Sequence, residues 1–250
     1  MELKSNKKKS YNIKSKISYK MSEYLFHYTS MDKAIKIIAS NTLLFGKLET
    51  MNDINESYSC VFGNGETIKE SYVLLRRYQR LSFVVDKMPR RGYDIPSMWG
   101  HYAERGHGVC LVFDRQMLTD CFSSDMIKDN VDYSSKYDSS IIIEGDNVER
   151  FFTNNTKHLF FTKTSDWANE QEFRVIVKCA NGMGTKINFR NSLQAAVLYF
   201  AEDVEKGDSV FKSSNMDILA RLNPKIQLLE LGYWNGVANL RNNNGEEIVL

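Results

Sequence analysis

The sequence lacks the features of a membrane or secreted protein. None of its apolar runs approaches the roughly 20 residues that span a bilayer, and its N-terminal segment is too polar for a secretory signal. Its four cysteines are scattered along 250 residues, which argues against a disulfide framework and for buried, reduced thiols. We therefore predict a cytoplasmic protein with no membrane partner.

The common signatures of cofactor binding are also missing. Gly63-Asn64-Gly65 and Gly182-Met183-Gly184 have neither the third glycine nor the strand–turn–helix setting of a dinucleotide fingerprint. There is no phosphate-binding P-loop and no nucleophile elbow. His101, His107 and Cys110 have no evident fourth metal ligand, and Cys110 lies in an apolar run. These absences argue against Rossmann, P-loop and α/β-hydrolase folds, and they predict no metal.

Charge is unevenly distributed along the chain. Residues 1–20 hold seven lysines and the single acid Glu2, a net charge of +6. Because the whole chain carries +2, the remainder must carry 2 − 6 = −4. We expect residues 1–20 to be a basic, disordered arm. Such an arm could contact nucleic acid or another polyanion, or it could simply keep the protein soluble.

Hydrophobic patterning indicates one α+β domain over residues 21–250, with a helical insertion around 115–165. Ser30 is suited to cap a helix that ends near Asn41. The other helices are expected at 66–80, 97–104, 148–161 and 214–222. Strands are expected at 24–28, 42–48, 81–85, 108–113, 171–178, 194–200 and 226–231.

The most informative segment is 166–174, which leads into the apolar run Val175-Ile176-Val177. On a strand, Glu170, Glu172 and Arg174 would share one face, opposite a core-facing row that begins with Phe173. Such a charged row is either solvated surface or a set of acids that line a cleft. The rest of the chain favours the cleft.

Three further groups of residues are candidates for a binding site. His27-Tyr28-Thr29 ends a strand just before a helix, although a histidine there is more often structural. Trp99, His101 and Tyr102 share a short helix and could stack a planar ring, or they could belong to the core. Asn52 lies in a polar segment with Asp53 and Glu56, which could equally be an ordinary turn.

Taken in chain order, from His27 through Asn52 and Trp99 to the segment 166–174, the four groups resemble a widespread bacterial family, the domain of unknown function family 2971. The resemblance covers about residues 24–232. The family's layout is similar to that of ADP-ribosyltransferases, including the DarT-like toxins. It implies mixed or antiparallel sheets that form a split β core with flanking helices, and NAD as the substrate without a glycine-rich fingerprint.

The resemblance also implies roles for individual residues. Glu172 would stabilise the positive charge that develops on the ribose when the nicotinamide bond breaks, and Glu170 would orient the acceptor or a ribose hydroxyl. His27 would hydrogen-bond the nicotinamide-side ribose, with Thr29 nearby. The nicotinamide ring would stack on Tyr28, Trp99 or Tyr102. NAD would also contact His101, Asn52 and Arg174. Arg174 would neutralise the acids or contact the pyrophosphate, or else form a salt bridge across the sheet.

We therefore expect an NAD-dependent ADP-ribosyltransferase or NAD glycohydrolase, acting as a toxin or an antiviral defence effector. Its acceptor would be a protein side chain, a nucleic acid or water. Two alternatives stay open. One is a non-catalytic sensor that binds a nucleotide in the same cleft, and the other is a nucleic-acid binder or enzyme that uses the basic arm.

Overall fold

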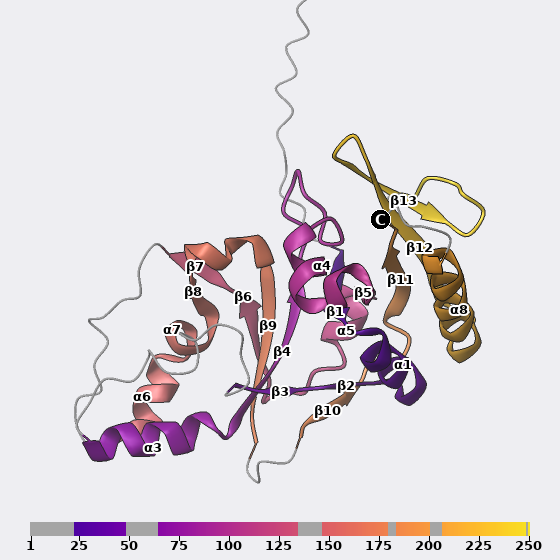
Figure 1. Ribbon diagram of the computed structural model, residues 1–250. Coiled ribbons are helices and arrows are strands. Elements are labelled where there is room, and N and C mark those ends of the chain that lie inside the picture. The colour runs from indigo at the N-terminus through magenta and orange to yellow at the C-terminus, as the bar shows by residue number, and fades with distance from the viewer. Residues whose placement is uncertain (1–22, 49–64, 135–146, 180–183, 201–206, 249) are drawn as a thin grey trace, which may run out of the picture.

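The computed structural model describes residues 23–48, 65–134, 147–179, 184–200, 207–248 and 250. Its main feature is a nine-stranded sheet with the order β13-β12-β11-β5-β1-β4-β9-β6, in which β3 also pairs with β4 (Figure 1). All pairs in this sheet are antiparallel except β11 with β12. Two small sheets, β10-β2 and β7-β8, accompany it. The predicted α+β class, with a mixed central sheet and flanking helices, is confirmed.

The strands have the following bounds: β1 Tyr24–Thr29, β2 Thr42–Leu44, β3 Gly46–Lys47, β4 Tyr78–Val84, β5 Val109–Asp114, β6 Ile127–Asn130, β7 Asp132–Ser134, β8 Thr162–Thr164, β9 Glu172–Lys178, β10 Lys186–Asn188, β11 Leu193–Tyr199, β12 Gln227–Trp234 and β13 Val237–Asn242. The helices are α1 Met31–Ser40, α3 Gly65–Leu75, α4 Pro96–Tyr102, α5 Arg115–Thr119, α6 Val148–Asn154, α7 Thr156–Phe161 and α8 Gly207–Leu222. Two 3-10 helices, η2 Glu104–Gly106 and η3 Ser165–Glu170, complete the described elements.

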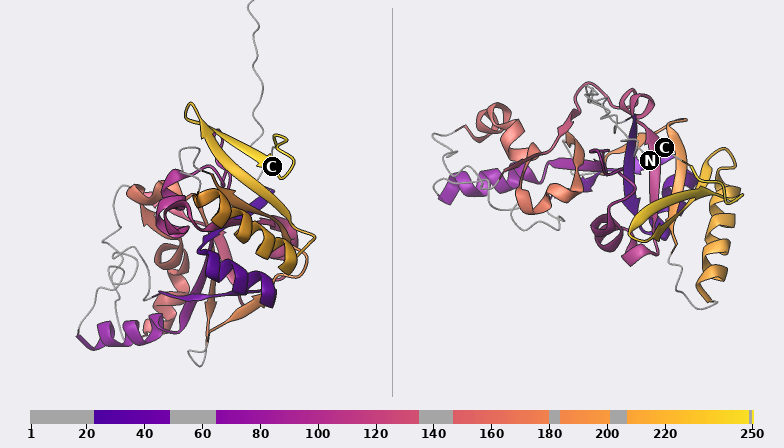
Figure 2. Two further views of the ribbon diagram at one scale, coloured as in Figure 1. Left: turned by 45° about the vertical axis from the view of Figure 1, so that its right-hand side comes forward. Right: turned by 90° about the horizontal axis from the view of Figure 1, so that it is seen from above.

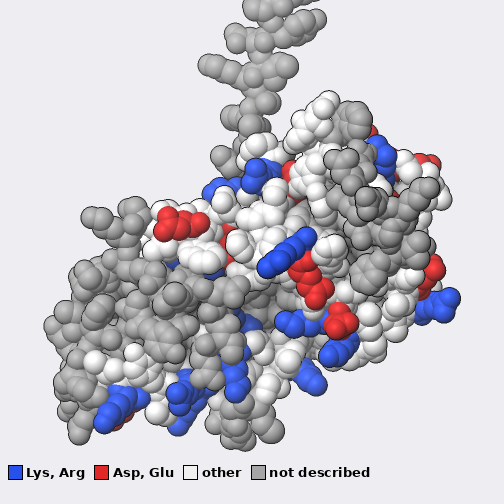
Figure 3. All heavy atoms as spheres, in the orientation of Figure 1, with Lys and Arg blue, Asp and Glu red and all other residues white. Residues whose placement is uncertain are grey.

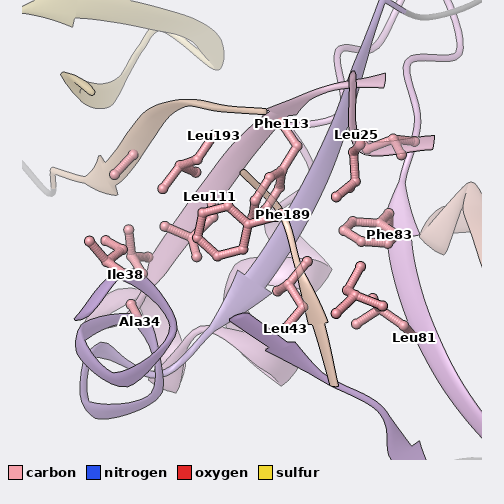
Figure 4. Packing of buried hydrophobic residues seen from close by; sticks show 14 of the residues in the cluster. Leu25, Ala34, Ile38, Leu43, Leu81, Phe83, Leu111, Phe113, Phe189 and Leu193 are labelled. Atoms are coloured by element: carbon pink, nitrogen blue, oxygen red, sulfur yellow. The ribbon is translucent and has the colours of Figure 1, made fainter. Parts of the chain in front are cut away.

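Helices gather at both ends of the sheet. Figures 1 and 2 show α3, α6 and α7 beyond β9 at one end, and α8 beside β12 at the other. The central strand β5 is buried along nearly its whole length, as its apolar sequence predicts. Its alternate residues face two different clusters: Leu111 and Phe113 belong to one, and Cys110 and Val112 belong to the other. Figure 4 shows the first cluster, in which Leu111 and Phe113 pack beside Phe189.

The sheet is incomplete between β1 and β4. These strands pair at one position, Phe26 opposite Val84, whereas β1 pairs with β5 at six positions and β4 pairs with β9 at seven. At its other end, β4 pairs with β3 through Arg80 opposite Gly46 and Gln79 opposite Lys47. On the edge of β4 that faces away from β9, the pairing is therefore interrupted between the contact with β3 and the contact with β1. We call this region, between β1 and residues 80–84 of β4, the seam.

Several elements differ from the sequence predictions. The helix expected over 66–80 ends at Leu75, and Tyr78 starts a strand in which burial alternates with period two. The helix expected over 148–161 is two helices, because Asn155 leaves the helical conformation with a φ of −111°. The insertion expected around 115–165 also contains β6 and β7. The residues of β6 are all exposed, so apolar alternation could not reveal this strand.

Some predictions concern residues outside the described part of the chain. These are the basic arm of residues 1–20, the segment with Asn52, Asp53 and Glu56, and Cys60. The other three cysteines, Cys110, Cys121 and Cys179, are free thiols. Among the described residues, no helix combines the length and apolar character needed to cross a bilayer.

Candidate functional site

The seam opens into a cavity of about 500 Å³. Its walls come from β1, from the middle of β4, and from α1 with the segment that follows it. Apolar side chains, including Leu43, Leu81 and Phe83, form much of the lining, and Figure 4 shows these three on neighbouring elements. A volume of this size is typical of a site for a small organic ligand.

His27 lies on β1 at this seam. Its Nδ1 lies 3.1 Å from the carbonyl oxygen of Ser82 on β4. A carbonyl only accepts hydrogen bonds, so Nδ1 carries the proton, and Nε2 of the neutral ring is an acceptor. Burial lowers the pKa of His27. The hydrogen bond to the Ser82 carbonyl raises this pKa and the positive charge of Lys33 lowers it, but the effect of burial is the largest. The neutral ring is therefore the favoured form at neutral pH, with one nitrogen suited to receive a ligand hydroxyl.

Ser82 provides a second polar group at the seam. Its hydroxyl oxygen is buried and has no hydrogen-bond partner within the described part of the chain. A buried hydroxyl without a partner costs free energy, so such a group is uncommon unless it has another role. Because Ser82 lines the cavity, a rotation of its side chain would bring the hydroxyl to a bound ligand.

The acid pair reaches the cavity by a different geometry from the one that the sequence predicted. Glu172 begins β9, but Glu170 is the last residue of η3, and Gln171 between them adopts a left-handed conformation with a φ of 46°. The expectation that Glu170 shares a strand face with Glu172 was therefore wrong. Both residues still line the cavity.

Lys163 on β8 holds the two acids together. Its Nζ lies 2.5 Å from Oε2 of Glu170 and 3.0 Å from Oε2 of Glu172. The Tyr102 hydroxyl donates to Oε1 of Glu170 over 2.6 Å. The Lys163 side chain is 2% exposed, so this ammonium group is removed from water and depends on its carboxylate partners.

Arg174, which also lies on β9, forms a bidentate salt bridge with Glu172. Its Nε and Nη2 donate to the two carboxylate oxygens, each over 2.8 Å, and its Nη1 donates to the Phe160 carbonyl over 2.6 Å. Burial alone would raise the pKa of Glu172, but the charges of Arg174, Lys163 and Arg80 hold it well below its usual value. Glu172 is thus ionised at neutral pH and fixed in orientation.

The structure brings six of the predicted site residues to the wall of this cavity: His27, Tyr28, Thr29, Tyr102, Glu170 and Glu172. It does not bring Trp99, His101 or Arg174 there. Trp99 packs edge-on behind Tyr28, with ring centroids 5.1 Å apart, and His101 is exposed on α4. Arg174 is buried behind Glu172 and pairs with it within β9, which fits the expected neutralisation of the acids and not a contact with pyrophosphate.

Other cations of the site do not stand out in the sequence. Lys33 and Lys36 of α1 and Arg80 of β4 line the cavity. The two lysines lie three residues apart on one helix, a spacing that puts them on the same face and is the one signal of a shared role in the sequence. Lys163 follows the apolar residues Leu159–Phe161, and a single lysine there gives no signal of burial. On the face drawn in Figure 3, basic side chains are spread along the lower part of the molecule.

Comparison with known proteins supports the family resemblance over part of the chain. Residues 98–175 match a family model described as "Protein of unknown function (DUF2971)". This segment includes Tyr102, Glu170, Glu172 and Arg174, whereas His27 lies outside it. Searches of curated proteins and of solved structures each found no match.

Proposed function

We propose that the cavity binds NAD and that the protein transfers its ADP-ribosyl group to an acceptor or to water. The observation that carries this proposal is that His27 of β1 and Glu172 of β9 line one cavity. The first supplies an acceptor for a ribose hydroxyl, and the second supplies a fixed negative charge. No glycine-rich fingerprint is required for this mode of binding.

The charges of the cavity suit the parts of NAD. Lys33, Lys36 and Arg80 provide cations for the pyrophosphate, whereas Glu170 and Glu172 provide the acidic part of the wall. Apolar lining side chains such as Phe45 and Phe83 can cover a planar ring. Tyr28 and Tyr102 are the cavity-lining aromatic residues from the predicted ring-stacking set.

The reaction breaks the bond between ribose C1′ and the nicotinamide nitrogen. Nicotinamide leaves with the bonding electron pair, and positive charge develops on the ribose. The ionised Glu172 carboxylate stabilises that charge. Its oxygens hold several lone pairs, so Glu172 can accept a ribose hydroxyl in addition to its bonds from Arg174. The acceptor then bonds to C1′ and its proton passes to Glu170, the carboxylate without a bidentate arginine.

Substitution of Glu172 tests this proposal. Glu172→Gln retains the shape of the side chain and removes its charge, so nicotinamide release should fall roughly 100- to 1000-fold. Asp166→Asn is the matched control, because Asp166 is an exposed acid in η3 close in sequence. Nicotinamide can be followed by NMR, with circular dichroism to show that each variant is folded. NAD consumption by Glu172→Gln at the wild-type rate would contradict the assignment.

One observation favours a second candidate, a sensor that binds the nucleotide without turning it over. Both oxygens of Glu172 already receive hydrogen bonds from Arg174, and Lys163 pairs with both acids. Such a network can serve structure alone. Calorimetry with NAD and ADP-ribose distinguishes the candidates, because saturable binding of both without nicotinamide release supports the sensor.

A further inference from the structure

A second cavity, of about 340 Å³, lies where α4 and η2 meet the ends of β11 and β12. Three aromatic rings line it, from Trp99, Tyr199 and Tyr233. The centroids of the Trp99 and Tyr199 rings are 5.9 Å apart, as are those of Tyr199 and Tyr233. This aromatic cavity is distinct from the seam cavity, since the two share no lining residue.

Hydrogen bonds hold two of the rings in place. Trp99 Nε1 donates to the Tyr93 carbonyl over 2.9 Å, and the Tyr233 hydroxyl donates to Asp94 Oδ1 over 2.5 Å. Burial and the bond to Asp94 raise the pKa of Tyr233, so this hydroxyl remains a donor. Rings that are fixed at their polar edges lose little further freedom when a ligand stacks on them.

Arg105 brings a positive charge to the aromatic cavity. It is exposed and has a φ of 57°, between Glu104 with a φ of 49° and Gly106 with a φ of 94°. Three successive left-handed residues are costly for side chains other than glycine. The Glu104 carboxylate fixes this turn by accepting the Met31 backbone N–H over 3.1 Å. At Gly106, a Cβ would lie 2.9 Å from the Tyr199 ring, so glycine permits the close approach.

We propose that the aromatic cavity binds a nucleobase that carries a phosphate group. The base stacks on the partly exposed rings of Tyr199 and Tyr233, which the buried Trp99 supports, and the phosphate pairs with the Arg105 guanidinium. Stacking of a base on an aromatic side chain contributes about 1–3 kcal/mol. The same guanidinium would repel an organic cation, the other common ligand of an aromatic cage. The ligand is thus a free nucleotide or a base of a single strand.

Two substitutions test this inference separately from the NAD proposal. A Cβ added at Gly100 meets no atom within 4 Å, so Gly100→Leu can occupy the aromatic cavity without a clash at its first atom. Arg105→Asn removes the charge and suits the left-handed conformation. Arg190→Asn is the matched control, since Arg190 is also exposed and has a φ of 51°. It lies just before the start of β11, whereas the aromatic cavity is at the end of that strand.

The measurement is calorimetric titration of the full chain with AMP, a short single-stranded oligoadenylate, and ribose 5-phosphate. We expect AMP or the oligoadenylate to bind saturably, with affinity reduced at least about tenfold by Gly100→Leu and severalfold by Arg105→Asn. Arg190→Asn should bind as the wild type does, and ribose 5-phosphate should not bind. Preference for AMP or for the oligoadenylate identifies the source of the base.

Absence of saturable binding by both ligands would overturn the inference. So would affinities that Gly100→Leu and Arg105→Asn leave unchanged, because the nucleotide would then occupy another site, such as the seam cavity. If two molecules of AMP bind to each chain, loss of one of the two binding events in the variants supports the aromatic cavity. Should Gly100→Leu fail to fold, Arg105→Asn decides alone, and neither result depends on whether NAD is consumed.

Discussion

At the scale of single residues, the site depends on a balance of buried charges. Two carboxylates, those of Glu170 and Glu172, face two cations, those of Lys163 and Arg174. Each of the four residues is at most 7% exposed, so none can be stabilised well by water. Removal of one member leaves an uncompensated buried charge. This costs more free energy than the intact network contributes to stability.

Lys163→Met should therefore destabilise the fold by about 3–5 kcal/mol, the typical cost of breaking a buried ion pair. The free energy of unfolding in urea measures this effect. Lys157→Met is the control, because Lys157 pairs with Asp132 over 3.0 Å with both side chains largely exposed, and its loss should matter little. Equal stability of the two variants would show that the charges of the acid pair are not coupled through Lys163.

The lowered pKa of Glu172 makes a separate prediction about pH. The folded state favours the ionised carboxylate, so its contribution is complete above the usual pKa of about 4.5 and is lost as pH falls through the lowered value. The stability difference between the wild type and Glu172→Gln should therefore shrink as pH decreases below about 4.5. Urea unfolding at several pH values measures it. His27 titrates in both proteins and cancels from the difference, and a difference that stays constant to low pH would contradict the assigned ionisation.

At the scale of elements, a close backbone contact positions α4 and η2 against β1. Gly108 follows η2, and a Cβ there would lie 2.3 Å from the Thr29 carbonyl oxygen and 2.8 Å from the carbonyl carbon of Ala103. Backbone atoms cannot move away as a flexible side chain can. This contact keeps Tyr102, at the end of α4, within reach of Glu170.

Gly108→Ala should therefore destabilise the protein by about 1–3 kcal/mol, as overpacking generally does. Gly100→Ala is the matched control: it adds the same methyl group to open space within α4, and should stabilise by about 0.5–1 kcal/mol. Thermal unfolding compares the two variants. If Gly108→Ala is as stable as the wild type, the contact does not constrain the two elements.

Local chemistry made some elements predictable from the sequence. The predicted caps of α1 are confirmed: the Ser30 hydroxyl accepts from the Lys33 backbone N–H, and Asn41 is left-handed with a φ of 52°. The apolar run of β5 likewise predicted a buried strand. The sequence did not reveal β6 or β10, because these strands depend on partners distant in the chain and carry little or no continuous apolar pattern. It also did not reveal β13, although this strand pairs with β12 across the two-residue turn Asn235-Gly236, which is a typical hairpin signal.

The candidate site was predictable only in part for the same reason. Motif order identified His27, Tyr102 and the acid pair, which all line the cavity. Trp99 looked equally suitable, but the turn of α4 directs it to the aromatic cavity. The cations Lys33, Lys36 and Arg80 are ordinary surface residues in the sequence, and only the meeting of α1 with β4 gives them a shared role.

At the scale of the whole molecule, the seam joins two parts of one sheet. On one side β1 is paired with β5, and on the other β4 is paired with β9, but between them a cavity replaces most of the pairing. Strand edges without continuous partners exchange their amide hydrogens more readily than paired ones. A ligand in the cavity contacts both edges, so its binding should stabilise the seam more than the rest of the sheet.

Amide hydrogen exchange of the full chain with and without NAD therefore tests whether the seam is an NAD site. We expect NAD to slow exchange in Tyr24–Thr29 and Tyr78–Val84 and to leave β13, at the far edge of the sheet, unchanged. Protection confined to other parts of the chain, or no protection at saturating NAD, would show that the seam is not an NAD site.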